Sequence, residues 1–242
     1  MFNQEELQNE LRKEYPIFIG EGNIGRIYVN ESKNKILKLP KYNLYFKDNS
    51  LLEKLVLIDH DNFSFPIDLI YKDIDNSNRI VGYTARFSKG ESIEDMNKEI
   101  LFDDFVKSVE NGFKNILLMY EKGIIPYDLY LQNMLYEEKN IYFIDTDSYL
   151  IGDNKYYFEK TLDTYFKEIF NFLNNSLTIT DIYEGDINNP RTKLIQDFWF
   201  NKISLLEYLT KFKELYFDIH KSELITINDF MNDSKQYVRK SK

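Results

Sequence analysis

The sequence predicts an α+β fold in which a sheet-forming segment is followed by a mainly helical one. Up to about residue 86, short runs rich in β-branched and aromatic residues alternate with turn-forming residues, which is typical of antiparallel strands. From residue 92 to 122 the pattern becomes one long helical run that ends before Gly123, a residue favoured after a helix C-terminus. Hydrophobic residues form 43% of the 242 residues, which is ample for a packed core.

Local propensity predicts each element of the sheet-forming segment. Polar turn residues at 73–78 separate the last two expected strands. Ser50 is a favourable N-cap for the helix expected after the third strand. The expected elements are a short leading helix at 3–14, a strand–turn–strand unit at 17–29, a strand at 35–39, a helix at 50–59, and strands at 67–71 and 79–86.

The rest of the chain is expected to be mainly helical. After the helix at 92–122, a motif-bearing loop at 125–133 lies between short strands. Helices are expected from about residue 157 to the end, interrupted by a loop at 185–190. The change in composition near residues 87–91 marks the expected boundary between the two parts.

Composition excludes several classes of function. The net charge of −9 is the opposite of what a duplex nucleic-acid binder normally carries, so no nucleic-acid partner is expected. The absence of cysteine excludes disulfides and thiol catalysis, and two isolated histidines make a zinc site improbable. No apolar run approaches the roughly 20 residues of a membrane span, and the N-terminus lacks signal-peptide features, so a cytoplasmic protein is expected.

Three glycines, Gly20, Gly22 and Gly25, form a G-x-G-x-x-G pattern. A dinucleotide-binding turn with this pattern leads into a helix, whereas here the β-forming residues at 26–29 return the chain as a strand. A glycine turn between two strands suits a flap over phosphates, because the missing Cβ atoms let backbone N–H groups approach closely. The alternative is an ordinary hairpin turn.

A lysine and a glutamate follow this turn. Lys38 lies in an apolar strand, on the face opposite Leu37 and Leu39, where it either faces solvent or points into a cleft. Glu53 lies in the next expected helix, and an inward-facing glutamate there could form an ion pair with Lys38.

Three polar residues near the middle of the chain have the spacing of a phosphoryl-transfer centre. Asp128 and Asn133 are in the expected loop, and Asp145 follows an apolar strand, where a carboxylate is costly to bury without a partner such as a cation. Asp and Asn also stabilise turns, which is the alternative role of the first two. Asp147 is expected to be a solvated loop residue, with a second cation ligand as the alternative.

Taken in order, these residues resemble the motifs of the protein-kinase-like superfamily. The resemblance is carried by the glycine-rich loop at 20–25, the Ile36-Leu37-Lys38 strand, Glu53, the Asp128-Leu129 pair with Asn133, and Asp145. It implies a bilobal fold with an N-lobe at 1–86 formed by an antiparallel sheet and one helix, a hinge at 87–91, and a helical C-lobe at 92–242.

The resemblance also implies roles for these residues with ATP and Mg²⁺ as cofactors. Lys38 would hold the α- and β-phosphates with Glu53 as its partner, and Asp128 would orient or deprotonate the acceptor hydroxyl. Asn133 and Asp145 would bind Mg²⁺. The residues implied in nucleotide binding are Gly20, Glu21, Gly22, Asn23, Gly25, Lys38, Arg86 and Ser88.

The sequence departs from the family pattern around the catalytic loop. Pro126 and Tyr127 replace the His-Arg pair, Tyr130 replaces a lysine, and Asp147 replaces the last glycine of D-F-G. The segment after Asp145 is short and lacks A-P-E. The resemblance implies a kinase, with a protein Ser/Thr hydroxyl favoured as acceptor. A small-molecule kinase of the aminoglycoside or choline type, or a pseudokinase scaffold, are the alternatives.

Overall fold

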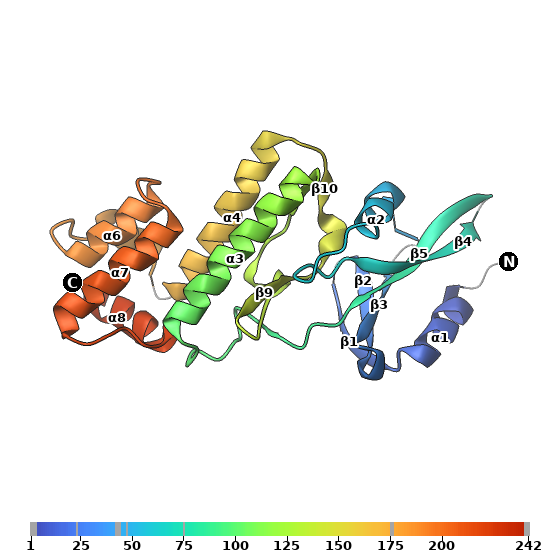
Figure 1. Ribbon diagram of the computed structural model, residues 1–242, viewed down its shortest axis with the longest axis horizontal. Helices are drawn as coiled ribbons and strands as arrows, with labels where there is room; N and C mark the ends of the chain where they lie inside the picture. The colour runs from blue at the N-terminus through green and yellow to red at the C-terminus, as the bar shows by residue number, and fades with distance from the viewer. Residues whose placement is uncertain are drawn as a thin grey trace.

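An antiparallel sheet forms one end of the molecule and helices form the other (Figure 1). The computed structural model describes residues 4–22, 24–41, 45–46, 48–74, 76–174 and 177–239. The sheet has the strand order β1-β2-β3-β5-β4, and each neighbouring pair is antiparallel. Its strands are β1 (Ile17–Glu21), β2 (Gly25–Asn30), β3 (Lys35–Pro40), β4 (Pro66–Ile74) and β5 (Ser77–Arg86). The predicted α+β class is confirmed.

Two helices pack against this sheet. α1 (Gln4–Glu14) places Leu11 against a cluster that includes Leu37 and Leu39. α2 (Asn49–Leu55) places Leu52 in a separate cluster with strand residues including Tyr83. α2 is shorter than the helix expected at 50–59, and its N-cap is Asp48, whose side chain accepts a hydrogen bond from the backbone of Leu51.

Short strands connect the sheet to the helical part. β6 (Glu91–Ser92), β8 (Met134–Glu137) and β9 (Asn140–Phe143) form one small sheet, and β7 (Ile124–Ile125) pairs with β10 (Leu150–Ile151). The helix expected at 92–122 begins only at residue 102, because residues 91–100 form β6 and turns instead. These strands frame the loops that contain residues 126–133 and 144–149.

Helices account for most of the remaining chain, as predicted. They are α3 (Phe102–Glu121), α4 (Lys155–Leu173), α5 (Ile179–Glu184), α6 (Pro190–Trp199), α7 (Leu205–His220) and α8 (Ile227–Arg239). A buried ion pair between Arg191 and Asp233 joins α6 to α8. Among the described residues, no helix is long and apolar enough to cross a bilayer. The cytoplasmic location stays a prediction.

One large hydrophobic cluster extends across the expected lobe boundary. It contains the cores of α3, α4, α7 and α8, and it also contains Leu51 and Leu55 of α2 and Phe63 of the following segment. Helix α2 is therefore packed against the helical part as well as against the sheet. The division into lobes at 1–86 and 92–242 stays a prediction.

Candidate active site

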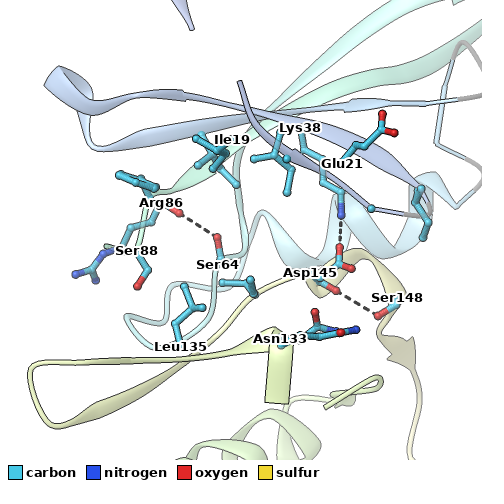
Figure 2. Close-up of a pocket in the computed structure, with 18 of the residues that line it drawn as sticks. Ile19, Glu21, Lys38, Ser64, Arg86, Ser88, Asn133, Leu135, Asp145 and Ser148 are labelled. Carbon is cyan, nitrogen blue, oxygen red and sulfur yellow. Dashed lines mark hydrogen bonds and ion pairs between the residues drawn. The ribbon is translucent and has the colours of Figure 1, made fainter. Parts of the chain in front are cut away.

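A cavity of about 510 Å³ lies between the sheet and the loops that contain Asp128 and Asp145. Figure 2 shows Lys38 reaching from the sheet towards Asp145 on the opposite side. The volume is within the range of small-molecule binding sites. The cavity is lined by Ile19, Gly20, Glu21, Gly22, Ile24, Ile27, Ile36, Lys38, Ser64, Tyr83, Arg86, Phe87, Ser88, Asp128, Gln132, Asn133, Leu135, Ile144, Asp145 and Ser148.

The glycine-rich turn joins β1 to β2 over this cavity. The backbone N–H of Gly22 donates a 2.9 Å hydrogen bond to the carbonyl of Gly25. Gly20 and Gly22 line the cavity, and a Cβ atom on either would meet no atom within 4 Å. A Cβ on Gly25 would lie 2.8 Å from the carbonyl oxygen of Leu39 and 3.1 Å from two side-chain carbons of Lys38. Asn23 lies outside the described residues.

Glu21 lies at the end of β1 and lines the cavity, but its carboxylate already has cationic partners. It forms ion pairs with Lys41 at 2.9 Å and with Arg26 at 3.3 Å. Hydrogen bonds from these two side chains hold the pKa of Glu21 below its usual value. The contacts tie the glycine-rich turn to β2 and to the residue that follows β3.

Lys38 is the buried cation of the site. Its side chain is 4% exposed, and its ammonium forms ion pairs with Asp145 and with Asp147, the latter at 2.8 Å. Burial alone would lower the pKa of Lys38, but these carboxylates outweigh burial and raise it, so the side chain is cationic at neutral pH. Of the two orientations considered from the sequence, the structure has the one that points into the cleft.

The expected ion pair between Lys38 and Glu53 is not formed, and this expectation was wrong. Glu53 is exposed on α2 and accepts a 3.2 Å hydrogen bond from the hydroxyl of Tyr71. The reason is the rotation of the helix, whose buried face carries leucines at 51, 52 and 55 and leaves position 53 outside.

The loop around Asp128 is fixed by its own backbone and by Asn133. Asp128 has φ of 66°, a left-handed conformation that Asp tolerates better than most residues. The side-chain amide of Asn133 donates a 2.9 Å hydrogen bond to the carbonyl of Asp128. The carbonyl of Asn133 in turn accepts a 3.0 Å hydrogen bond from the N–H of Ile144, which connects this loop to the segment that contains Asp145. Burial, and secondly the charge of Asp145, raise the pKa of the Asp128 carboxyl.

Asp145 and Asp147 lie on one tight turn but face different surroundings. Asp145 has φ of 59°, lines the cavity and is 33% exposed, whereas the Asp147 side chain is 2% exposed. Burial opposes ionisation of Asp145, but contact with Lys38 lowers its pKa overall. For Asp147, burial, reinforced by Asp145 and opposed by Lys38, raises the pKa to about 6.

The solvated-loop expectation for Asp147 was therefore wrong. Its place four residues after the half-buried strand β9 and two residues from Asp145 is the sequence signal that could have indicated burial. Tyr83 was also missed: it is buried, lines the cavity and pairs with Lys38 across β3 and β5. Its position opposite Lys38 is set by strand register, which the sequence alone did not give.

Asn133 and Asp145 have the chemistry that a magnesium ion requires. Both line the cavity, and carboxylate and amide oxygens are hard ligands. Because the amide nitrogen of Asn133 already bonds Asp128, its oxygen is the atom left for a cation. Mg²⁺ commonly takes one or two carboxylates together with phosphate and water, which is the kind of ligand set that Asp145 and Asn133 could begin.

Arg86 and Ser88, which the resemblance implies in nucleotide binding, also line the cavity. The carbonyl of Arg86 accepts a 3.0 Å hydrogen bond from the hydroxyl of Ser64, and the hydroxyl of Ser88 donates a 2.7 Å hydrogen bond to the carboxylate of Glu137. Figure 2 shows Arg86 and Ser88 at the end of the cavity opposite Asp145. Six of the residues implied in nucleotide binding line this one cavity: Gly20, Glu21, Gly22, Lys38, Arg86 and Ser88. Gly25 is not among the lining residues, and Asn23 lies outside the described part of the chain.

Comparison with known proteins gives one informative similarity, and no family model matches the chain. The chain is similar to the KEOPS complex subunit Bud32 of Pyrococcus abyssi, with 24% identity over 138 residues. The match covers 57% of this chain and 58% of that protein, so the chain spans less than two thirds of its relative. This distant similarity and the arrangement of sheet, cavity and helices together identify the fold as protein-kinase-like.

Proposed function

We propose that this protein is an ATP- and Mg²⁺-dependent kinase that transfers the γ-phosphate to a hydroxyl acceptor. The observation that supports it most is the convergence of Lys38, Asp128, Asn133 and Asp145 on one cavity below a glycine-rich turn. Phosphoryl transfer depends mainly on positioning and electrostatic stabilisation, and these are the residue types that supply both.

Lys38 and the glycine-rich turn are assigned to the phosphates. A buried, permanently cationic ammonium at the cavity wall attracts phosphate oxygens strongly, because little water screens it. Gly20 and Gly22 have open space where a side chain would be, so their backbone can approach a nucleotide closely.

Asp128 is assigned to the acceptor hydroxyl, and Asn133 and Asp145 to Mg²⁺. The raised pKa of Asp128, caused by burial and by the charge of Asp145, makes its carboxylate a better proton acceptor than an ordinary aspartate. Bound Mg²⁺ would supply neutralisation of charge on the phosphates. The hydrogen bond from Asn133 to the Asp128 carbonyl holds the base and the cation ligand in a fixed relation.

A protein Ser/Thr hydroxyl is the first candidate acceptor, favoured by the overall resemblance of the motifs to those of protein kinases. A small-molecule hydroxyl is the second, and the position of α4 favours it. This helix begins at Lys155, so only residues 146–154 separate it from Asp145. So short a segment leaves little chain for an activation loop or for docking a peptide.

The test is transfer of label from γ-labelled ATP in the presence of Mg²⁺. The protein is incubated alone, with myelin basic protein, and with an aminoglycoside or choline as small acceptors. Label transfer or ATP hydrolysis is expected, and Asp128→Asn should lower it roughly 100-fold or more. Asp218→Asn, at an exposed position on α7, is the matched control and should leave it unchanged.

Nucleotide binding without turnover under any of these conditions would instead support a nucleotide-binding scaffold. The feature that favours this alternative is Tyr130, an exposed residue at the position where the kinase resemblance implies a lysine. Equal turnover by the wild type and Asp128→Asn would remove Asp128 from the proposed mechanism.

A further inference from the structure

Lys38 has two carboxylate partners, and they are not equivalent. The Asp145 carboxylate is partly open to the cavity, whereas Asp147 is almost fully enclosed and does not line the cavity. A buried ammonium needs a partner, since removal of one member of a buried ion pair leaves an uncompensated charge. The contact of Asp147 with Lys38, at 2.8 Å, is made by a carboxylate that does not line the cavity.

Helix α2 cannot provide this partner in its present rotation. Leu51, Leu52 and Leu55 are all at most 2% exposed and fix which face of the helix turns inward. Lys54 adds a 3.0 Å hydrogen bond to the carbonyl of Gly123 in the helical part. Bringing Glu53 inward would require removing these buried leucines from two hydrophobic clusters.

The turn that carries Asp147 is itself well anchored. The hydroxyl of Thr146, a fully buried residue, donates a 3.2 Å hydrogen bond to the carbonyl of Ser64. The hydroxyl of Ser148 donates a 3.2 Å hydrogen bond to the carbonyl of Asp145, and the N–H of Tyr149 donates a 3.2 Å hydrogen bond to the carbonyl of Thr146. A carboxylate on a turn fixed from both sides is suited to holding a long, flexible lysine side chain in one position.

We propose that Asp147 is the positioning residue for Lys38, in place of the glutamate on α2 that the kinase resemblance implies. This inference rests on the proposed function, because Lys38 is positioned for nucleotide phosphates. Phosphate-binding geometry is then set by the turn at 145–148 and does not depend on an ion pair with α2. A second cation ligand is the competing role for Asp147, and its enclosure behind Lys38 argues against it.

The first experiment measures the pairing without any nucleotide. Unfolding is followed for Asp147→Asn, Glu53→Gln and Lys38→Met, and for each carboxylate variant combined with Lys38→Met, to form two double-mutant cycles. Coupling is expected between Lys38 and Asp147 and not between Lys38 and Glu53. Coupling with Glu53 equal to or larger than that with Asp147 would overturn the proposal.

The second experiment measures affinity for a fluorescent ADP analogue in Mg²⁺ and in EDTA. Asp147→Asn is expected to weaken binding of the analogue at least tenfold, and by a similar factor in the two buffers. The affinity of Glu53→Gln is expected to stay within twofold of wild type. In the Lys38→Met background, Asp147→Asn should cause no further loss. A loss confined to Mg²⁺ buffer would identify a cation ligand instead, and unchanged affinity would reduce Asp147 to a purely structural role.

These outcomes separate the two proposals. If the wild-type protein binds the analogue but never transfers phosphate, the kinase proposal fails while the role of Asp147 is still decided by the affinities. If the wild-type protein binds no nucleotide, the positioning role fails together with the proposed function, whatever the unfolding cycles show.

Discussion

Glu53 and Asp147 are two carboxylates with opposite surroundings. Glu53 lies on α2, exposed and hydrogen-bonded to Tyr71, while Asp147 lies on a tight turn, enclosed and paired with Lys38. The kinase resemblance implies that Glu53 pairs with Lys38, and Asp147 was expected to be a solvated loop residue. A motif position therefore fixes where a residue lies along the chain, whereas packing determines which carboxylate reaches Lys38.

Packing of α2 explains the difference in physical terms. At about 100° per residue, Glu53 is rotated about 200° from Leu51 around the helix axis. Leu51, Leu52 and Leu55 lie within a single arc and are buried. Burial of three leucines stabilises the fold by several kcal/mol, about 1.5–3 kcal/mol for each, which exceeds the gain from a single ion pair near a surface.

The largest effect is expected from Asp145, the cavity-facing member of the turn. Asp145→Asn removes the carboxylate that faces both the cavity and Lys38, so phosphate transfer should fall on the order of 1000-fold, about 4 kcal/mol in activation free energy. Steady-state kinetics with labelled ATP measure it. Asp153→Asn, exposed beyond the turn, is the control and should match wild type. Comparable activity in Asp145→Asn would mean that the turn does not take part in transfer.

Leu55 tests whether packing determines the rotation of α2. It is fully buried, and Leu55→Ala should lower the free energy of unfolding by about 2–5 kcal/mol. Glu53→Ala, on the exposed face of the same helix, should change it by no more than about 0.5 kcal/mol. Denaturant unfolding gives both values. Similar losses in the two variants would contradict the assignment of the buried face.

Gly25 tests how closely the glycine-rich turn confines Lys38. A Cβ there would contact the Leu39 carbonyl and the Lys38 side chain, so Gly25→Ala should cost about 1–3 kcal/mol in stability and also weaken nucleotide binding. Gly22→Ala adds a Cβ in open space and is the matched control for stability alone, because Gly22 is itself assigned to the nucleotide. Thermal unfolding and nucleotide titration of both variants distinguish them. Equal stability of the two variants, with unchanged nucleotide affinity in Gly25→Ala, would show that Lys38 moves aside without loss of stability or binding.

The sequence predicted the fold and most of the cavity because both depend on local patterns. Strand alternation placed Lys38 opposite Leu37 and Leu39, and the structure has these leucines in a separate hydrophobic cluster. The spacing of Asp128 and Asn133 marked a loop, which the amide–carbonyl hydrogen bond between them closes. Such features need only a few consecutive residues to specify them.

Non-local packing accounts for what the sequence did not predict. The burial of Asp147 depends on β3 and β5 lying across from the turn, and the place of Tyr83 depends on strand register. The early end of the helix expected at 50–59 has a similar cause. Leu57 is 82% exposed and adds no core contact to extend that helix.

Lys54, on the same helix as Glu53, is expected to have the smallest effect. Its ammonium donates a 3.0 Å hydrogen bond to the carbonyl of Gly123, which links α2 to the turn between α3 and β7. Lys54→Met keeps the aliphatic stem and removes the donor, so stability should fall by about 1 kcal/mol. Because α2 is a packing element and supplies no charge to the cavity, nucleotide affinity should stay within about twofold of wild type, a free-energy change below about 0.5 kcal/mol.

Denaturant midpoints and nucleotide titrations measure the two effects of Lys54→Met, with Lys160→Met at an exposed site on α4 as control. A large loss of affinity in Lys54→Met would show that the position of α2 controls the cavity after all. The helix would then act on Lys38 through the shared core, without an ion pair. Unchanged affinity with reduced stability would leave the turn that carries Asp147 as the element that sets the position of Lys38.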